Sequence, residues 1–221
     1  MTRTDYVWDE NSEPYSSKMG QYKTKMELGF IENALKNYPL NSKVLDVGGG
    51  SGRFSRRLIN KGFIPTIIDS NEIAIKIAGE NGIDAECADF FEYSPMKKFD
   101  VILSIEVLSY IENKSLFFEK VHSLLEKDGI FIFTAANPKS WRYLLRNSLK
   151  SKFKFHEQYL QSYREQLENN FKIVEIKGFL WQPFSLTSNN VMISFFAKLE
   201  KLLFSKLLKQ SPWWLFACIK K

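Results

Sequence analysis

The amino-acid sequence predicts an α/β fold, with a mostly parallel, seven-stranded sheet, an antiparallel last strand, helices on both faces and a helical lid between the fifth and sixth strands. Short hydrophobic β-type runs alternate with amphipathic helical segments about five times before residue 140. Parallel neighbouring strands need such crossover segments, so the alternation itself indicates a parallel sheet. A glycine-rich segment at 48–52 follows the first run, at the place where open α/β sheets bind ligands.

The elements are predicted in the following order. Residues 18–37 carry apolar side chains at helical spacing, and Pro39 closes this first helix. Hydrophobic runs predict strands at 43–47, 63–69, 83–89, 99–105 and 130–136. The segments between them at 53–62, 71–82 and 114–129 have helical character, and Gly129 is expected to end the last of them. Residues 171–184 are predicted as the sixth strand with its exit, and 213–220 as the seventh.

The chain length favours one domain. Its 221 residues with 44% hydrophobic content suffice to bury a full core, and a second independent core is not expected. We therefore expect a single domain over 1–221. Its parts are an N-terminal lid and helix at 1–40, a ligand-binding core at 41–138, a lid insertion at 139–170, and C-terminal strands with an amphipathic helix at 171–221.

Charge and cysteine content exclude several classes of protein. The net charge is +6, but the lysines are spread widely among 25 acidic residues, which is typical of a solvated surface and does not indicate a nucleic-acid partner. Cys87 and Cys218 form neither a disulfide framework nor a zinc pattern, and we expect no metal. The start lacks a signal-peptide pattern, and lysines interrupt every long apolar run. We expect a cytoplasmic protein.

The stretch VLDVGGGSGRFS, residues 44–55, indicates the kind of ligand. Glycines after a strand accept positive φ and let a ligand approach the backbone. A dinucleotide fingerprint would need glycine or alanine where Arg53 stands, and the carboxylate of Asp46 would repel a pyrophosphate. The same carboxylate would attract a ligand with an ammonium group, such as S-adenosylmethionine. A phosphate-binding P-loop is excluded because no Gly-Lys-Ser/Thr follows.

From about residue 15 to 137 the chain resembles the class I S-adenosylmethionine-dependent methyltransferases, of the small-molecule type similar to ubiquinone-biosynthesis methylases. The motifs that carry the resemblance are VLDVGGGSGRFS, FIPTIIDS, CADFFEY, FDVILSIEVLSYIEN and LLEKDGIFIFTAANP, in that order. The resemblance implies a Rossmann-like fold with S-adenosylmethionine as cofactor. It implies cofactor contacts at Asp46, Gly48, Gly49, Gly50, Gly52, Asp69, Ser70, Asp89, Phe90, Ser104, Ile105 and Glu106.

Some of these positions have specific expected roles. An acidic residue at the end of the second strand can accept hydrogen bonds from ribose hydroxyls, so Asp69 is expected to bind the ribose. The other interpretation is that Asp69 caps the next helix, and both roles are compatible. By resemblance, Asp89 binds the adenine amino group and Phe90 covers the ring. Tyr15 and Tyr22 resemble aromatic residues of the family's lid over the methionine part, and Tyr22 is the preferred candidate.

The acceptor is less well defined by the sequence. Relatives often have Glu-His where this chain has Ser109 and Tyr110, and the Asn/Asp-Pro-Pro-Tyr/Phe motif of nucleic-acid amino-methyltransferases is absent. The favoured function is therefore methylation of a hydroxyl on a small molecule. An RNA or protein methyltransferase that uses the basic C-terminal third, or a catalytically silent cofactor-binding scaffold, are the alternatives. His156 is the candidate general base, with helix capping or lid packing as its other interpretation.

The C-terminal helical segment at 191–210 has one apolar face flanked by lysines. Packing onto the sheet explains this face, and peripheral contact with an anionic membrane is the alternative. The sequence leaves the oligomeric state open.

Overall fold

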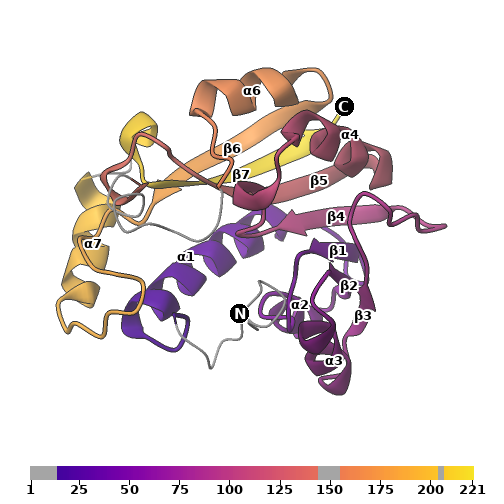
Figure 1. The fold of residues 1–221 in the computed structure, drawn as a ribbon, viewed down its shortest axis with the longest axis horizontal. Helices are drawn as coiled ribbons and strands as arrows, with labels where there is room; N and C mark the ends of the chain where they lie inside the picture. The colour runs from indigo at the N-terminus through magenta and orange to yellow at the C-terminus, as the bar shows by residue number, and fades with distance from the viewer. Residues whose placement is uncertain (1–13, 144–154, 204–206) are drawn as a thin grey trace.

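The computed structural model describes residues 14–143, 155–203 and 207–221, and within them seven strands form one sheet in the order β3-β2-β1-β4-β5-β7-β6 (Figure 1). The strands are β1 Lys43–Val47, β2 Ile64–Asp69, β3 Asp84–Cys87, β4 Phe99–Ser104, β5 Leu125–Ala136, β6 Phe171–Phe179 and β7 Trp213–Lys220. β1 pairs in parallel with both β2 and β4, whereas β7 is antiparallel to both β5 and β6. The predicted sheet is confirmed, including its antiparallel last strand.

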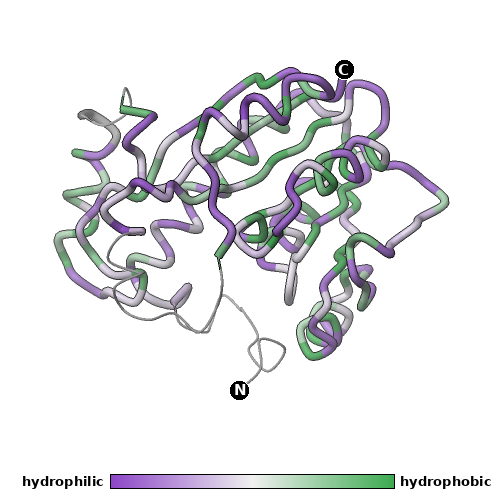
Figure 2. Tube along the Cα trace, turned by 45° about the horizontal axis from the view of Figure 1, so that its top comes forward, coloured by the Kyte–Doolittle hydropathy of each residue, from purple (hydrophilic) through white to green (hydrophobic). Residues whose placement is uncertain are grey.

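Helices cover both faces of this sheet. They are α1 Lys18–Leu35, α2 Ser55–Ile59, α3 Glu72–Glu80, α4 Lys114–Leu124, α6 Leu160–Glu168 and α7 Ile193–Leu203, with short 3-10 helices η2 Leu108–Tyr110 and η3 Leu208–Gln210. One core lies between the sheet and α4 with α6, and includes Phe117, Phe118 and Tyr163. A second lies beneath α1 and α2, and includes Phe30, Ile31 and Leu58 (Figure 1). A small third cluster lies beneath α3. Figure 2 shows hydrophobic segments running through the middle of the molecule.

Side-chain caps explain where three of the helices begin. Ser17 accepts a hydrogen bond from the backbone N–H of Gly20, Asn71 accepts two from the first turn of α3, and Asn113 accepts one from Leu116. Each side chain satisfies a donor that the first helical turn leaves unpaired. Asn71, and not Asp69, therefore caps α3.

Two predicted boundaries were wrong. The helix expected over 114–129 ends at Leu124, and β5 begins at Leu125, which is fully buried and pairs with Phe99 of β4. Burial of Leu125 against the sheet outweighs the helical spacing of 125–129. The helix expected over 191–210 begins at Ile193, and 208–210 form a separate 3-10 helix. Of the predicted helical insertion, 144–154 lie outside the described residues.

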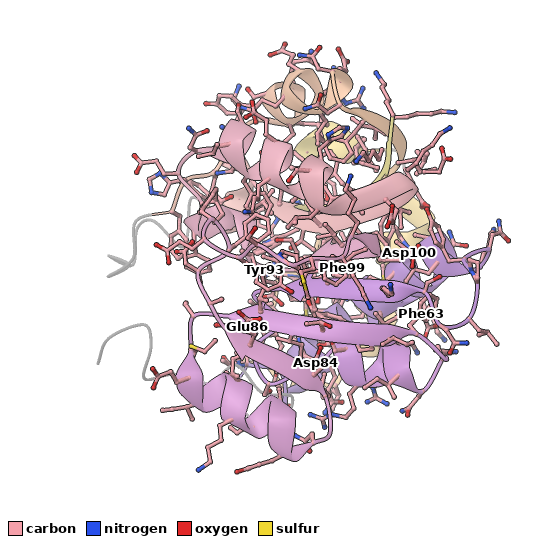
Figure 3. The ribbon with its side chains drawn as sticks, turned by 90° about the vertical axis from the view of Figure 1, so that its right-hand side faces the viewer. Phe63, Asp84, Glu86, Tyr93, Phe99 and Asp100 are labelled. Atoms are coloured by element: carbon pink, nitrogen blue, oxygen red, sulfur yellow. The ribbon has the colours of Figure 1, made fainter. Side chains whose placement is uncertain are left out.

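β3 is an edge strand of the sheet, and it carries charged side chains. Asp84 and Glu86 lie on β3 near Tyr93 (Figure 3), and their charges, after burial, raise the pKa of the Tyr93 phenol. Charged side chains on an edge strand disfavour pairing with another sheet. Within the described part of the chain, every helix is too short or too polar to cross a bilayer.

Candidate functional site

A cavity of about 920 Å³ lies at the carboxyl ends of β1, β2 and β4. This is the edge of a parallel sheet where ligands bind in open α/β folds. Ten of the residues predicted to bind a cofactor line it: Asp46, Gly48, Gly49, Gly50, Asp69, Ser70, Asp89, Phe90, Ile105 and Glu106. Four predicted site residues do not line it: Tyr22, Gly52, Ser104 and His156.

The turn after β1 brings the backbone close to the carboxylate of Asp46. A Cβ atom on Gly49 would lie 2.7 Å from Cγ of Asp46, so only glycine fits there. Gly50 has φ +55°, in the left-handed region that favours glycine. Asp46 is buried and accepts a hydrogen bond from Oγ of Ser55 at 2.7 Å. Burial raises its pKa to about 6, so this carboxylate would gain from a cationic ligand.

Backbone amides orient the carboxylate of Asp69. Its Oδ2 accepts from the N–H of Gly50 and its Oδ1 from the N–H of Asn71, both at 2.9 Å. Each oxygen keeps further lone pairs, so the side chain is aimed by the backbone and still has capacity to accept from a ligand.

The loop after β3 presents one exposed carboxylate beside a buried aromatic ring. Oδ1 of Asp89 accepts from the N–H of Phe91 at 2.7 Å, which fixes the turn. The Phe90 ring packs on Phe117 of α4, with 4.7 Å between the ring centroids. Both residues line the cavity, and their contact with adenine stays a prediction.

Glu106 is the most tightly held acidic residue in the cavity. It follows β4 with φ +67°, and its backbone N–H donates to Oγ1 of Thr134. Its carboxylate accepts from Arg53 at 2.6 Å, from Tyr15 at 2.9 Å, and from the ammonium of Lys23. Burial alone would raise its pKa, but the charges of Lys23 and Arg53 lower it to about 2. Glu106 therefore stays ionised.

The sequence reasoning missed three charged residues of this network. Lys23 and Glu27 of α1 are fully buried, with Nζ of Lys23 2.5 Å from Oε1 of Glu27, and Arg53 lies 3.7 Å from the other oxygen of Glu27. Burying charges is costly unless they are paired, so the network has a defined geometry. Burial raises the pKa of Glu27 to about 6. The only signal in the sequence was the i, i+4 spacing of Lys23 and Glu27 on one helix.

The two tyrosines proposed for the lid lie in different places. The Tyr15 ring stacks on the guanidinium of Arg53, 3.8 Å from its centroid, and lines the cavity. Tyr22 lies instead beside Glu200 of α7, where burial and the charge of Glu200 raise the pKa of its phenol. Tyr15 therefore has the position that the sequence favoured for Tyr22.

Three other predicted residues lie next to the cavity without lining it. A Cβ on Gly52 would lie 2.5 Å from Cδ1 of Ile83, so this glycine packs against the neighbouring core. Ser104 is fully buried at the end of β4. The backbone of His156 is fixed, because its N–H donates to the carbonyl of Ser109 at 2.8 Å and its carbonyl accepts from Lys114.

The remaining wall of the cavity is mostly apolar and comes from the end of η2, the start of β7 and three loop segments. Its residues include Tyr110, Ile111, Phe155, Leu186, Thr187 and Trp213. The rings of Tyr110 and Phe155 contact each other with 5.6 Å between their centroids. Within residues 14–143, 155–203 and 207–221, no three His, Cys, Asp or Glu side chains gather as a metal site would require.

Comparison with known proteins adds a family and several relatives. The sequence model of a family described as a methyltransferase domain matches residues 21–179. The chain is 28% identical over 158 residues to malonyl-[acyl-carrier protein] O-methyltransferase 2 of Ilyobacter polytropus. The matched region covers 66% of this chain and 59% of that relative. It is 30% identical over 185 residues to the ubiquinone biosynthesis O-methyltransferase of Rickettsia bellii, which covers 72% of this chain and 75% of that relative. The chain thus spans about three fifths of the first relative's length and three quarters of the second's.

Solved structures of low sequence identity share the fold. The N-methyltransferase NodS from Bradyrhizobium japonicum WM9, in complex with S-adenosyl-L-homocysteine, superposes with a TM-score of 0.65 at 18% identity. The match covers 96% of this chain and 92% of NodS.

Proposed function

The chain belongs to the family defined by this methyltransferase domain, and we propose that it transfers a methyl group from S-adenosylmethionine to a small-molecule acceptor. The observation that carries the proposal is the buried carboxylate of Asp46 directly behind the glycine turn, at the wall of the cavity. A carboxylate whose pKa is raised by burial is stabilised in its ionised form by a cation. The ammonium group of the ligand's methionine part is such a cation.

The residues at the cavity wall fit the other parts of this ligand. The carboxylate of Asp69, aimed by two backbone amides, is placed to accept from the ribose hydroxyls. Asp89 and Phe90 offer an acceptor and an apolar surface for the adenine. The cavity volume lies near the upper end of the roughly 300–1,000 Å³ of ligand sites, which leaves room for an acceptor.

Bound S-adenosylmethionine supplies a methyl group that its sulfonium already activates, so the proposed reaction needs no metal. The protein's task is to hold the acceptor in line with the methyl–sulfur bond and to exclude water. Tyr15 and Arg53 line the cavity, and their hydrogen bonds to Glu106 hold both side chains in place. We infer that they help to cover the bound methionine part.

We propose a hydroxyl group as the acceptor atom, on a metabolite, a sugar or a lipid-linked intermediate. The names of the relatives, both O-methyltransferases, support this choice. The apolar loop wall around Tyr110, Phe155 and Leu186 supports an acceptor with an apolar body. Charged side chains that would select a nucleic-acid acceptor are not prominent on this wall within the described residues.

The first experiment is calorimetric titration of the protein with S-adenosylhomocysteine, followed by incubation with methyl-labelled S-adenosylmethionine and fractions of a cell extract. We expect binding with a one-to-one stoichiometry and label in a small-molecule fraction. Absence of binding contradicts the proposal. Label in RNA or protein favours the alternative acceptors, and binding without any transfer favours a silent scaffold.

A specific surface feature supports a second proposal, peripheral contact with an anionic membrane. Val191, Met192 and Phe195 are exposed at the start of α7, with Phe195 58% accessible, and Lys198 lies exposed one turn further along. Apolar side chains beside a lysine suit the headgroup region of an anionic bilayer. From the expected cytoplasmic location, the protein would meet such a surface with α7, which lies at one end of the molecule (Figure 1).

Vesicle flotation tests the membrane proposal. We expect the protein to float with vesicles that contain phosphatidylglycerol and not with pure phosphatidylcholine, and Phe195→Ser to reduce the bound fraction. Leu116→Ser is the matched control, because Leu116 is also exposed but lies on α4. Equal flotation of the two variants would count against a role for α7.

A further inference from the structure

We propose that two basic residues behind the cavity, Lys114 and Arg142, position the loop wall on which the acceptor binds. This inference rests on the proposed function, because it concerns the acceptor side of the same cavity. Neither side chain lines the cavity, and neither carries out chemistry. Both bind backbone carbonyls of loops whose neighbouring residues form the wall.

Lys114 joins two loops that are distant in sequence. It is 1% exposed, and its ammonium donates to the carbonyls of Ile111 and His156. His156 lies 42 residues after Lys114 in the sequence. The N–H of His156 donates back to the carbonyl of Ser109. These bonds hold the two loops together at the point where the Tyr110 and Phe155 rings meet in the cavity wall.

Arg142 holds a second loop, between β6 and α7. Its guanidinium donates to the carbonyls of Leu180, Gln182 and Phe184, so the chain curves around it over alternate residues. Leu180 has φ +67°, a conformation that is unfavourable for leucine, and its N–H donates to Glu200 of α7. The loop would not adopt this path without such partners.

The far end of the same loop is bound to the N-terminal helix. Oγ of Ser17 donates to the carbonyl of Leu186 at 2.6 Å, and the N–H of Met19 donates to the carbonyl of Ser188 at 3.0 Å. Leu186 and Thr187, which line the cavity, thus lie between Phe184, which Arg142 binds, and Ser188, which Met19 binds. Their positions depend on both.

Removal of either cation should affect acceptor binding more than cofactor binding, whereas loss of a residue with a general structural role should affect both. Asp69 and Asp89, which are expected to bind the cofactor, receive hydrogen bonds from backbone amides and not from either cation. Loss of Lys114 or Arg142 leaves partly buried carbonyls without this donor, and all of these carbonyls belong to the acceptor side. Acceptor binding should therefore weaken while cofactor binding stays nearly unchanged.

The test uses the full chain and four variants, Lys114→Met, Arg142→Met, and the conservative pair Lys114→Arg and Arg142→Lys. Lys76→Met on α3 and Arg164→Met in a separate groove at the β6 edge are the matched controls. The affinity for S-adenosylhomocysteine is measured by calorimetry. Binding of 2-naphthol, a neutral and flat hydroxyl probe, is then measured by its fluorescence on the protein saturated with S-adenosylhomocysteine.

We expect each methionine variant to weaken 2-naphthol binding about 10-fold, with the affinity for S-adenosylhomocysteine within about threefold of the wild type. Arg142→Lys should recover part of the loss, since an ammonium still serves some of the three carbonyls. The controls should bind both ligands as the wild type does. Equal loss of both ligands, unchanged 2-naphthol binding, or a wild type that binds S-adenosylhomocysteine but not 2-naphthol each overturns the proposal.

Hydrogen exchange separates this inference from the proposed function and does not depend on any ligand. Amide protons at 155–157 and 184–188 should exchange faster in Lys114→Met and Arg142→Met, respectively, and the rest of the sheet should exchange as in the wild type. Failure of the wild type to bind S-adenosylhomocysteine, with these exchange changes present, contradicts the proposed function and leaves the loop anchoring in place. Unchanged exchange at both segments contradicts the anchoring. A methionine variant that does not fold is replaced by its conservative counterpart in the same measurement.

Discussion

The two sides of the cavity are built in opposite ways. On the cofactor side, acidic side chains such as Asp69 and Asp89 accept hydrogen bonds from backbone amides at the ends of strands. On the proposed acceptor side, backbone carbonyls of loops accept from the buried ammonium of Lys114 and from the half-buried guanidinium of Arg142. The first arrangement leaves carboxylates facing the ligand, and the second leaves an apolar wall facing it.

Asp69 on one side and the two loop-binding cations on the other also differ in the sequence separation of their partners. Asp69 is 2 residues from Asn71 and 19 from Gly50. Lys114 is 42 residues from His156, and Arg142 is 38 from Leu180. Short-range partners appear as a sequence motif, whereas long-range partners appear only when the chain is folded. The difference teaches why the cofactor, and not the acceptor, could be predicted.

The largest expected effect is on the cofactor side, from Gly50→Val. The φ of +55° at Gly50 is strained for a branched residue, and the N–H of Gly50 would no longer aim the carboxylate of Asp69. We expect affinity for S-adenosylhomocysteine to fall by about 1,000-fold or more, below detection by calorimetry. Circular dichroism should show a folded protein.

An exposed glycine gives the control for that substitution. Gly79→Val on α3, where a Cβ would have open space, should fold and bind normally. A folded Gly50→Val protein with wild-type affinity would contradict the assignment of the glycine turn to the ligand.

Asp69→Ala should have the next largest effect. Two ribose hydrogen bonds to a charged acceptor would be lost together, each worth about 1.5–3 kcal/mol. The amides of Gly50 and Asn71 would also lose their acceptor. We expect the dissociation constant for S-adenosylhomocysteine to rise by about 100-fold or more. Asp84→Ala, at the exposed end of β3, is the matched control, and equal affinities of the two variants would remove Asp69 from the site.

Much of the fold and of the cofactor side could be predicted from the sequence, because these features depend on local motifs and on the order of the strands. The alternation of strands and helices fixes a parallel sheet, and a parallel sheet brings the ends of β1, β2 and β4 to one edge. Asp46 lies one residue before the end of β1, Gly50 follows β1, and Asp69 ends β2. Their meeting therefore follows from the strand order, without knowledge of any side-chain packing.

The network around Glu106 could not be predicted in the same way. Lys23 reaches Glu106 from α1, and whether a lysine on an amphipathic helix faces solvent or a buried partner depends on the helix rotation. Tyr15 and Tyr22 both lie near the start of α1, so the sequence does not show which of them faces the cavity, and the preference for Tyr22 was wrong in this respect. Contact of Tyr22 with Glu200 depends on packing of α1 against α7, which no local pattern indicates.

A moderate effect is expected when the affinity for the cofactor is measured as a function of pH. This measurement tests whether the ionised carboxylate of Asp46 contributes to binding. Because burial raises the pKa of Asp46 to about 6, the protein without ligand holds this group protonated below that pH and ionised above it. Affinity for S-adenosylhomocysteine should therefore rise about 5- to 10-fold between about pH 5 and pH 7, as the carboxylate becomes available to the ligand's ammonium. Calorimetry across this range measures it.

The stability of the protein without ligand should change in the opposite direction. A raised pKa means that the folded state favours the protonated form, so this contribution to stability is present below the unfolded pKa and is lost as the pH rises through about 6. Asp46→Asn should flatten both profiles, because an amide still accepts from Ser55 but does not titrate. A titration of affinity that persists in Asp46→Asn would assign it to another group, such as Glu27, whose pKa is also raised to about 6.

The smallest effect is expected from His156→Ala, on the acceptor side. The sequence suggested a general base here, whose removal would slow transfer to a hydroxyl by about 10²- to 10⁴-fold. In the structure, His156 serves through its backbone, which both Ser109 and Lys114 bind, and its side chain does not line the cavity. Alanine keeps both backbone bonds. We therefore expect single-turnover transfer to the acceptor found in the extract screen to change by less than about threefold, with unchanged affinity for S-adenosylhomocysteine. Tyr110→Phe is the companion variant, because it removes a hydroxyl from a residue that does line the cavity while keeping the ring contact with Phe155. A loss of about 100-fold in His156→Ala would show that its ring reaches the acceptor, and would make the acceptor wall a source of catalytic groups as well as of shape.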